Sequence, residues 1–345
     1  MKQGPYRLLI VDDSPEVRRS IIDIVEPDGR FEVVGEAEQG AQALRMVSEL
    51  EPDVISLDIV MPGMNGITAL KHLMINRPTP TVMVSSLTRE GEESSMEALR
   101  FGAVTFVPKL SRLEERDLSQ QADDIVTKLL WAAQVEVEAI RYIRAYPSTE
   151  MQGIGGPCRT VAAIGAHEGG YSALMKIIPR LKPAPDIGWI VVLYEPGRYV
   201  DAFVEYLERY STLSIRRAED GAPLVGGVCH IAAGDDYVTL RHDGNGHALH
   251  VHPAPFDSQK GSINRVFFSL AEVMQQHSVG VVLSGSGDDG AEGMAEIDRV
   301  GGTVIVQDPR SCLVKEMAEN IIALNPSIRV IPDGHIADEM SAMMG

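Results

Sequence analysis

The 345-residue sequence is poor in cysteine and aromatic residues. Its three cysteines, Cys158, Cys229 and Cys312, lie far apart and form no CxxC pair. This spacing fits reduced thiols in a cytosolic (cytoplasmic) protein better than a disulfide framework or a zinc knuckle. No window approaches about 18 uninterrupted apolar residues, and no apolar signal-peptide region follows Met1. We therefore expect neither a membrane-spanning helix nor a secreted protein.

Positive charge is also scarce, because 31 Lys and Arg face 49 Asp and Glu and give a formal net charge of −18. Such a charge repels phosphate backbones and anionic lipid surfaces, so we expect no nucleic-acid partner and no membrane insertion. The content of 44% hydrophobic and 23% charged residues is typical of soluble globular proteins. At roughly 150 residues per domain, the length indicates about two domains.

The first 110 residues alternate short apolar runs with amphipathic segments. Segments such as Pro15–Val25 and Ala41–Leu50 carry apolar residues at helical spacing. Alternating strands and helices predict a parallel sheet with helices on both faces, which is a doubly wound α/β fold. The expected strands are Leu8–Val11, Phe31–Val34, Val54–Leu57, Thr81–Val84 and Val104–Val107.

A connector follows this first domain. A long helical pattern runs from about Ser119 to Tyr146 and ends at Pro147. The next residues, 147–157, are rich in Gly and Pro and have no hydrophobic periodicity, which is typical of an interdomain linker. The helix could pack on the sheet, bridge the domains or pair with a second copy, so the oligomeric state stays open.

The second half repeats the alternation and predicts a second doubly wound α/β domain. A β-rich stretch from Ser214 to Val251 adds an antiparallel hairpin, and Met340–Gly345 is expected to be a frayed tail. The expected strands are Val161–Ile164, Trp189–Tyr194, Val279–Ser284 and Thr303–Gln307. The expected helices are Tyr171–Leu181, Val200–Tyr210, Asn264–Gln276 and Ala291–Val300.

Polar side chains lie at the ends of the first-half strands. Asp12 and Asp13 follow one strand and Asp58 follows another, while Ser85 ends the fourth and Lys109 follows the fifth. Ligands bind outside the carboxyl ends of parallel strands, and converging carboxylates favour a cation such as Mg²⁺. A carboxylate nucleophile, a metal and donors for the moving oxygens are what phosphoryl transfer requires. Solvated aspartates at strand ends are the simpler alternative for any one of these positions.

The motifs LLIVDDS, SLDIVMPGMNG, VMVSS and FVPK resemble those of response-regulator receiver domains over about the first 125 residues. The resemblance implies a flavodoxin-like fold and phosphorylation of Asp58 by a sensor histidine kinase. It further implies that Mg²⁺ is held by Asp12, Asp13, Asp58 and the backbone carbonyl of Val60. Ser85 and Lys109 would contact the phosphoryl oxygens.

Two further receiver positions follow from the same resemblance. Phe106 occupies the place of the aromatic switch residue. Val60 and Leu87 are apolar where many receivers carry polar groups that orient the attacking water. We therefore expect a long-lived phosphoryl form.

The second half contains five motifs at predicted strands and turns, three of them Gly-rich, and backbone N–H groups at Gly-rich turns can face an anion. They are IGAHEGG (164–170), VVLYEP (191–196), VGGVCHIAAG (225–234), SGSGDDGAEGM (284–294) and VQDPRSC (306–312). Their order resembles the effector domain of chemotaxis protein-glutamate methylesterases (CheB) from about Arg159 to the end. The expected organisation is a receiver at 1–125, a helical and Gly/Pro-rich linker at 126–158 and a CheB-like domain at 159–345.

The catalytic positions of that family are altered here. His167 stands in the place of the nucleophilic serine, Tyr194 in the place of the base histidine, and Asp289 retains the carboxylate. A triad needs an activated hydroxyl and a base that titrates near neutrality, and a tyrosine with a pKa near 10 is not such a base. We therefore expect a domain that has lost esterase chemistry and acts by binding a chemoreceptor or another signalling protein. In this hypothesis, phosphorylation at Asp58 changes how the second domain packs on the receiver. An active methylesterase and glutamine deamidase is the alternative.

Two routes could rescue hydrolysis. One is a relocated nucleophile at Ser284 or Ser286 beside Asp289, although neither serine follows the strand-to-helix turn. The resemblance places Ser286 where the family has a methionine whose backbone N–H lines the oxyanion site. The other route is a metal-activated water held by His167, Glu168, Glu195 and Asp289.

Three histidines also lie close together in the β-rich stretch, at His247, His250 and His252. Alternate residues share one face of a strand, so His250 and His252 could act together as ligands. No acidic residue accompanies them in this stretch, which favours a solvated hairpin face.

Overall fold

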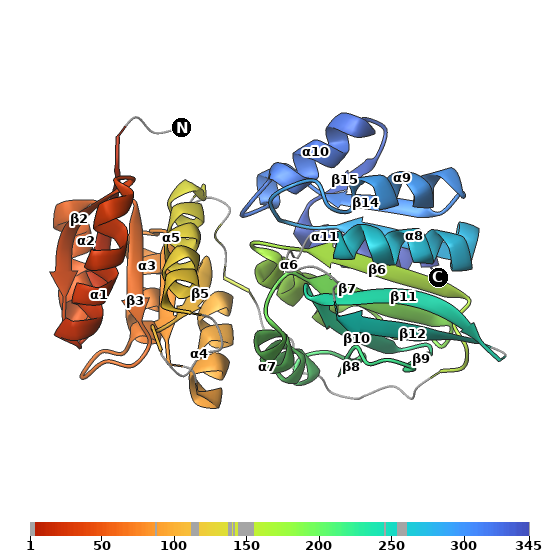
Figure 1. Ribbon diagram of the computed structural model, residues 1–345, viewed down its shortest axis with the longest axis horizontal. Coiled ribbons are helices and arrows are strands. Elements are labelled where there is room, and N and C mark those ends of the chain that lie inside the picture. Colours follow the sequence, from red (N-terminus) through yellow and green to blue (C-terminus); the bar gives the residue numbers. More distant parts are fainter. Residues whose placement is uncertain are drawn as a thin grey trace. The chain divides into compact units, whose positions relative to one another are not determined.

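The computed structural model describes residues 4–86, 88–111, 117–136, 140, 142–143, 155–244, 246–253 and 261–344. The chain divides into two compact units, Met1–Ile143 and Arg144–Gly345. Each unit is built on its own parallel sheet (Figure 1). Among the described helices, none combines the length and hydropathy needed to span a lipid bilayer.

A five-stranded parallel sheet in the order β2-β1-β3-β4-β5 forms the centre of the first unit. The central strands β1, β3 and β4 consist largely of buried apolar residues, as expected for strands covered on both faces. This sheet confirms the five strands predicted from the sequence. The strands are β1 (Tyr6–Val11), β2 (Phe31–Ala37), β3 (Val54–Asp58), β4 (Thr81–Ser85) and β5 (Thr105–Pro108).

The helices of the first unit begin at recognisable caps. The Ser14 side chain accepts a hydrogen bond from the Val17 N–H, and Pro15 occupies the first turn of α1. The helix α1 packs beside α5, and α3 contacts both α2 and α4 (Figure 1). The helices are α1 (Pro15–Val25), α2 (Gly40–Leu50), α3 (Gly66–Asn76), α4 (Arg89–Arg100) and α5 (Leu118–Gln134), with a short 3₁₀ turn η1 (Glu26–Asp28).

The long connector helix predicted to reach Tyr146 is wrong in its extent. The helix α5 ends at Gln134, because Val135 is extended. Beyond it, the Ile143 N–H donates to the carbonyl of Arg100, and the Tyr142 ring stacks on Phe101 at 5.7 Å. These contacts hold residues 142–143 against the end of α4. Within the predicted linker at 126–158, residues 137–139, 141 and 144–154 lie outside the described residues.

The second unit contains a seven-stranded parallel sheet in the order β15-β14-β13-β6-β7-β10-β8. Together with the first sheet, it confirms the predicted class of two doubly wound α/β domains. Its strands are β6 (Thr160–Ala166), β7 (Ile187–Leu193), β8 (Ser214–Arg217), β10 (Val228–Ala233), β13 (Ser278–Val282), β14 (Thr303–Gln307) and β15 (Arg329–Ile331).

The predicted antiparallel hairpin is also present. The strands β11 (Asp236–Asp243) and β12 (Gly246–Pro253) pair with the short strand β9 (Pro223–Leu224) in a second, three-stranded sheet. The helices of this unit are α6 (Gly170–Ile177), α7 (Gly197–Glu208), α8 (Ser262–Met274), α9 (Ala291–Arg299), α10 (Glu316–Leu324) and α11 (Asp333–Met344). Three 3₁₀ turns complete it: η3 (Ile178–Arg180), η4 (Gln275–His277) and η5 (Pro309–Ser311).

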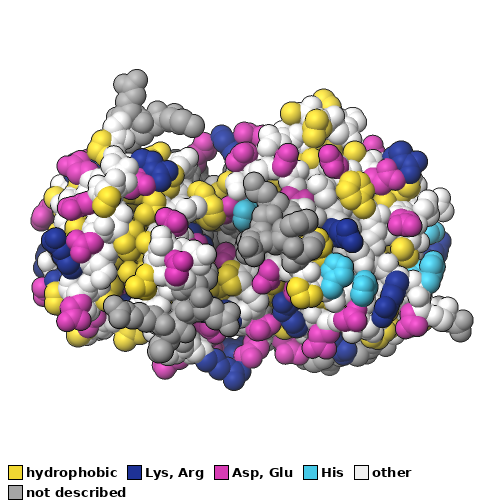
Figure 2. All heavy atoms as spheres, viewed as in Figure 1, with side chains coloured by type: hydrophobic (Ala, Val, Ile, Leu, Met, Phe, Trp, Pro, Cys, Tyr) yellow, Lys and Arg dark blue, Asp and Glu magenta, His cyan; other side chains and the backbone are white. Residues whose placement is uncertain are grey.

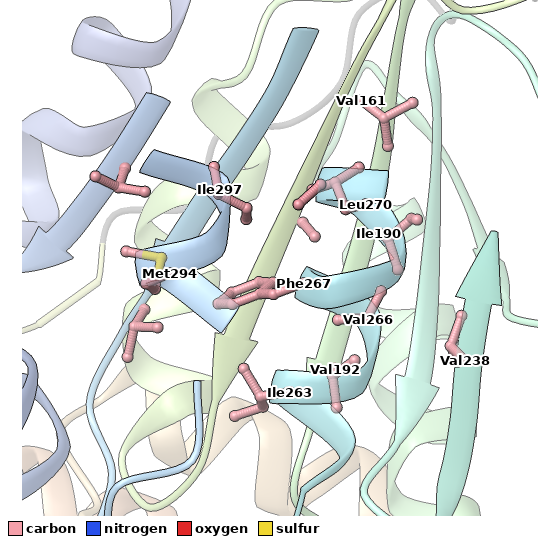
Figure 3. Packing of buried hydrophobic residues seen from close by; sticks show 14 of the residues in the cluster. Val161, Ile190, Val192, Val238, Ile263, Val266, Phe267, Leu270, Met294 and Ile297 are labelled. Carbon is pink, nitrogen blue, oxygen red and sulfur yellow. The ribbon is translucent and has the colours of Figure 1, made fainter. Parts of the chain in front are cut away.

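The helix α8 lies at the centre of the main core of the second unit. It contacts α9, β11 and β6, so both sheets are joined through its apolar side chains. Figure 3 shows Phe267 pointing toward Met294 of α9, while Val238 of β11 lies on the other side of the helix. The labelled core residues are Val161, Ile190, Val192, Val238, Ile263, Val266, Phe267, Leu270, Met294 and Ile297. This core positions the N-terminus of α8, which forms one side of the candidate site.

The tail predicted to be frayed is instead helical as far as it is described. Met340 lies within α11 and is fully buried. The same helix is tied to α6 by an ion pair between Lys176 Nζ and Asp333 Oδ2 at 2.7 Å. The short apolar and polar residues of this segment gave no clear period, so its packing against α6 was not predictable from the pattern alone.

Candidate functional site

Three carboxylates converge at the carboxyl edge of the first sheet, as the sequence predicts. Asp12 and Asp13 follow β1, and Asp58 is the last residue of β3. One oxygen from each lies within 4.8 Å of the others, and Asp12 and Asp58 are buried while Asp13 is exposed. Lys109 follows β5, and its Nζ lies 2.9 Å from Asp12 Oδ2 and 2.9 Å from Asp58 Oδ2. The structure therefore joins four of the predicted residues in one cluster.

The electrostatics of this cluster leave negative charge in a partly buried place. Burial raises the pKa of Asp58, the neighbouring Asp12 charge raises it further, and Lys109 opposes both effects. Burial lowers the pKa of Lys109, but its contacts with Asp12 and Asp58 outweigh this and the pKa lies above its ordinary value. The Lys109 ammonium pairs with Asp12 and Asp58, while three carboxylates meet in the cluster, so one ammonium does not balance their charge. Such an oxygen-rich cluster suits a hard divalent cation.

The other predicted receiver residues surround this cluster. Ser85 is buried at the end of β4, and its carbonyl accepts a hydrogen bond from the Lys109 N–H at 2.8 Å. The Val60 side chain is 70% exposed, and its N–H donates to Asp58 Oδ1 at 3.3 Å. Phe106 is buried in β5. Leu87 lies outside the described residues.

Sequence reasoning missed Lys128 of α5. Its side chain is buried, and its Nζ donates to the Phe106 carbonyl at 3.2 Å and lies 5.6 Å from the centre of the Phe106 ring. The position of Lys128 in the sequence could have indicated its burial. Lys128 falls three residues after Ile125, on the apolar stripe of the helix. A charged residue on such a stripe indicates a buried partner.

Gly66, at the start of α3, determines how closely this helix approaches Asp58, the predicted phosphoryl acceptor. A Cβ atom at Gly66 would lie 1.9 Å from the Asp58 carbonyl oxygen. The Gly66 N–H donates to the Ile59 carbonyl at 2.9 Å, so the start of α3 rests on the turn that follows Asp58. Glycine is therefore required for this close approach.

In the second unit, the three residues predicted to stand at the triad positions also come together. His167 follows β6, Tyr194 follows β7, and Asp289 lies in the loop after β13, and these three strands are neighbours in the sheet. The His167 and Tyr194 rings meet edge to face at 4.9 Å. The Tyr194 hydroxyl donates a hydrogen bond to Asp289 Oδ2. The structure therefore brings the predicted residues His167, Tyr194 and Asp289 into one cluster.

The Asp289 carboxylate accepts hydrogen bonds from backbone N–H groups at the starts of α8 and α9. Asp289 accepts hydrogen bonds from the N–H groups of Gly261 (3.2 Å), Ile263 (2.9 Å), Asn264 (3.0 Å) and Gly290 (3.0 Å). The Ser262 N–H donates to the Tyr194 oxygen at 2.9 Å. Burial and the Asp289 charge raise the pKa of Tyr194 well above its ordinary value. Tyr194 is therefore a neutral donor at pH 7 and not a base.

Glu168 has a role that the sequence did not reveal. Its carboxylate accepts from the Ser286 N–H at 2.7 Å and the Ser286 hydroxyl at 2.8 Å, and His167 Nδ1 lies 2.9 Å away. Burial raises the pKa of Glu168, but the contacts with His167 and Ser286 outweigh it and the pKa lies below its ordinary value. The carboxylate of Glu168 thus takes the N–H that the family resemblance assigns to the oxyanion site. This contact between Glu168 and Ser286 becomes visible only in the structure, where two loops that are far apart in the sequence meet.

The expected rescue routes do not find support in this geometry. The Ser284 hydroxyl is buried and donates to the Glu168 carbonyl at 2.6 Å, and the Ser286 hydroxyl is held by the Glu168 carboxylate. Within the described part of the chain, the sole group of three or more potential metal ligands is the aspartate cluster of the first unit. The proposed metal set of His167, Glu168, Glu195 and Asp289 is therefore wrong as a preformed site.

The histidines of the hairpin have an acidic partner that lies outside their own stretch. His250 Nδ1 lies 2.8 Å from Asp220 Oδ1, and this contact is the largest cause of a lowered pKa of Asp220. His242 and His247 face each other across the hairpin at a ring distance of 4.8 Å. The hairpin face remains partly solvated, as predicted, but it is more ordered than an array of separate side chains.

Comparison with known proteins agrees with both units. The family model described as "Response regulator receiver domain" matches residues 8–128, and the model described as "CheB methylesterase" matches residues 162–340. A Symbiobacterium thermophilum protein named protein-glutamate methylesterase/protein-glutamine glutaminase is 35% identical, over 99% of this chain and 98% of that protein. A Pyrococcus abyssi protein of the same name is 32% identical, over 94% of this chain and 90% of that protein.

A solved structure supports the second unit in particular. The Thermotoga maritima CheB methylesterase catalytic domain is 26% identical, with a TM-score of 0.50, and the match covers 53% of this chain and 98% of that domain. The chain therefore belongs to the CheB methylesterase family and carries a response-regulator receiver domain before its methylesterase domain.

Proposed function

We propose that this chain is a response regulator that receives a phosphoryl group on Asp58 from a sensor histidine kinase. The observation that carries the proposal is the cluster of Asp12, Asp13, Asp58 and Lys109 at the carboxyl edge of the first sheet. In the reaction, a carboxylate oxygen of Asp58 forms a P–O bond as the P–N bond of the kinase phosphohistidine breaks. The imidazole leaves with the electron pair of that bond and takes up a proton.

The residues of the cluster suit this reaction. Lys109 lies 2.9 Å from the acceptor carboxylate, so its ammonium is placed to pair with a phosphoryl oxygen. We assign Mg²⁺ to Asp12, Asp13, Asp58 and the Val60 carbonyl, and a bound Mg²⁺ neutralises charge that develops on the phosphoryl oxygens. The buried hydroxyl-bearing residue Ser85 contributes a further donor at the end of β4.

The surroundings of Asp58 also support slow hydrolysis of its phosphoryl group. Val60 presents an exposed apolar side chain two residues after Asp58, where a polar side chain would orient a water molecule. We propose that the phosphoryl form of the isolated chain persists for minutes or longer. A half-life of seconds would contradict this part of the proposal.

For the second unit, we propose that it binds glutamyl segments of a signalling partner, such as a chemoreceptor, without hydrolysing them. The relatives are named for action on protein glutamates and glutamines, which supports this class of partner. His167 provides no hydroxyl, Tyr194 is a neutral hydrogen-bond donor, and the Ser286 N–H is already bonded to Glu168. Loss of the nucleophile or the base from a comparable triad lowers kcat by about 10⁶-fold.

A second candidate function is active methylesterase and glutaminase chemistry. The comparisons favour it, because the similar full-length relatives are named as enzymes. The converged positions of His167, Tyr194 and Asp289 also preserve the site as a place where a glutamyl side chain could be held. The side-chain chemistry favours binding alone, and we therefore place the hydrolytic function second.

Phosphotransfer tests the first proposal. Purified chain is mixed with a histidine kinase that carries a radiolabelled phosphoryl group, in the presence of Mg²⁺. We expect label on the native chain and on Asp23→Ala, which removes an exposed carboxylate of α1, and none on Asp58→Ala. Continued labelling of Asp58→Ala would show that the acceptor lies elsewhere.

A further inference from the structure

A line of cationic and aromatic side chains crosses the antiparallel sheet of the second unit. We call it the hairpin ladder and define it by Arg265, Tyr237, His252, His250 and Arg241. The Arg265 guanidinium carbon lies 5.6 Å from the Tyr237 ring centre, the Tyr237 and His252 rings are 5.9 Å apart, and the His252 and His250 rings are 5.2 Å apart. Figure 2 shows histidine side chains (cyan) gathered with Lys and Arg side chains (dark blue) on this face.

The strand register explains why these side chains share one face. In the antiparallel pair, Tyr237 stands opposite His252 and Arg241 stands opposite Ala248. Alternate residues of a strand point to the same face, so His250 falls between those two pairs. Arg265 joins them from the first turn of α8.

The ladder carries two guanidinium groups that form no ion pair with the described residues. Among the described residues, neither Arg241 nor Arg265 has a carboxylate within salt-bridge distance, and both are exposed. Of the acidic groups beside the ladder, Asp220 pairs with His250 and Asp236 pairs with Arg217 at 2.5 Å, while Asp243 lies two residues after Arg241 on β11. In a chain of net charge −18, two unpaired guanidinium groups at the ends of an aromatic line are a local exception.

One end of the ladder adjoins the altered triad. The Tyr237 hydroxyl lies 4.0 Å from the point where a Cβ atom of Gly261 would stand, and the Gly261 N–H donates to Asp289. A segment held on the ladder would therefore have its end beside Asp289 and Tyr194. Exposed guanidinium groups and ring faces spaced along such a line fit a helix that carries several glutamates.

We propose that the hairpin ladder is the surface on which the second unit docks an acidic, glutamate-bearing helix of its partner. This inference rests on the proposed binding of glutamyl segments and adds the surface that recognises them. We assign an acidic helix to this surface because its charge is complementary to that of the guanidinium groups. The rest of this acidic chain repels an anionic helix. Binding is expected to weaken with ionic strength because both guanidinium groups are exposed.

The test uses the full-length chain and two synthetic helical peptides, one with glutamates along one face and one with glutamines in their place. Binding is measured by fluorescence anisotropy at low and high salt. We expect the native chain to prefer the glutamate peptide, and the double variant Arg241→Ala/Arg265→Ala to bind it about tenfold more weakly. The matched control Lys182→Ala/Arg299→Ala removes two exposed cations elsewhere in the same unit and should bind within about twofold of the native chain.

The outcomes separate this inference from the function on which it rests. If the native chain binds the glutamate peptide and the ladder variant binds it equally well, the ladder is not the docking surface, although partner binding stands. If the native chain binds neither peptide, both proposals are overturned. Tighter binding of a single-stranded oligonucleotide, or self-association that the ladder variant abolishes, would assign this surface to a different occupant.

Discussion

At the residue scale, the side chains at the three predicted triad positions of the second unit form hydrogen bonds within the protein. Tyr194 and Asp289 form a hydrogen-bonded pair that also receives backbone N–H groups from the start of α8. Glu168 bonds both the N–H and the hydroxyl of Ser286. These side chains satisfy one another, so none of these hydrogen bonds leaves a free base beside a nucleophilic hydroxyl.

The first prediction concerns the Tyr194 hydroxyl. In Tyr194→Phe, the buried Ser262 N–H loses its acceptor, and we expect the free energy of unfolding of the second unit to fall by about 1–3 kcal/mol. Chemical denaturation checks this value. The control Tyr142→Phe removes an exposed hydroxyl in the first unit and should change little. An unchanged Tyr194→Phe midpoint would mean that the hydroxyl does not support the network.

The second prediction concerns the charge on Asp58. Because its pKa is raised, the folded state binds this proton more readily than the unfolded state does. The ionised carboxylate therefore lowers stability at neutral pH, and this cost disappears as the pH falls below the ordinary value of 3.8. We expect Asp58→Asn to unfold at a higher urea concentration than the native chain at pH 7 without Mg²⁺.

Millimolar Mg²⁺ should reduce that difference, because it stabilises the native acidic cluster more than the variant. The exposed control Asp23→Asn should leave the midpoint nearly unchanged at both conditions. A lower midpoint for Asp58→Asn at pH 7 would contradict the raised pKa of the native carboxyl.

At the scale of elements, the alternation of strands and helices was sufficient to predict the first parallel sheet and four strands of the second, β6, β7, β13 and β14. It did not predict β15, and it placed β8 and β10 in the antiparallel stretch, although both lie in the parallel sheet. The pattern failed where a local signal was weak. The helix α5 stops at Val135, and α11 forms in the segment expected to fray, because tertiary packing determines both.

The candidate sites also contain contacts that the sequence predicts and contacts that it does not. The carboxylates and Lys109 lie at strand ends, so their meeting followed from the order of a parallel sheet. The contacts of Glu168 with Ser286 and of His250 with Asp220 join segments 118 and 30 residues apart in the chain. No periodicity encodes such loop contacts, and the sequence therefore left the roles of Glu168 and Asp220 open.

The third prediction tests how α3 supports the acceptor. In Gly66→Ala, the added Cβ would lie 1.9 Å from the Asp58 carbonyl oxygen and would push α3 away from the end of β3. We expect a loss of about 1–3 kcal/mol in the stability of the first unit, measured by urea denaturation. Gly156→Ala places a Cβ in open space and serves as the control. Equal stability of the two variants would exclude the close approach.

The fourth prediction concerns His230 of β10. The imidazole is buried, and burial lowers its pKa from 6.5 to about 4. The unfolded chain takes up a proton below pH 6.5 while the folded chain does not until about pH 4, so stability falls across that window. We expect a cost of about 3 kcal/mol at full protonation. The free energy of unfolding, measured between pH 6.5 and 4, should change less with pH in His230→Gln than in the native chain. The control His335→Gln, which changes an exposed histidine, should keep the native dependence. An unaltered slope in His230→Gln would assign the effect to another group.

At the scale of the whole molecule, the chain joins a receiver domain with an acidic cluster to a methylesterase domain in which we propose that His167 and Tyr194 replace the nucleophile and the base. The family membership and the order of the two domains follow from matches over residues 8–128 and 162–340. The first unit thus keeps the residues for receiving a signal, while the second keeps the fold and the convergence of the site. Our account assigns partner binding to the second unit.

Methanol release tests this account most directly. Full-length chain, phosphorylated at Asp58, is incubated with a protein carrying glutamyl methyl esters, beside Asp289→Ala and a blank without enzyme. We predict methanol at the blank level for both proteins, because His167 has no hydroxyl to attack an ester and the Tyr194 hydroxyl, with its raised pKa, is a neutral donor to Asp289 and not a base. Release above the blank that is abolished in Asp289→Ala would contradict the account and establish the hydrolytic function.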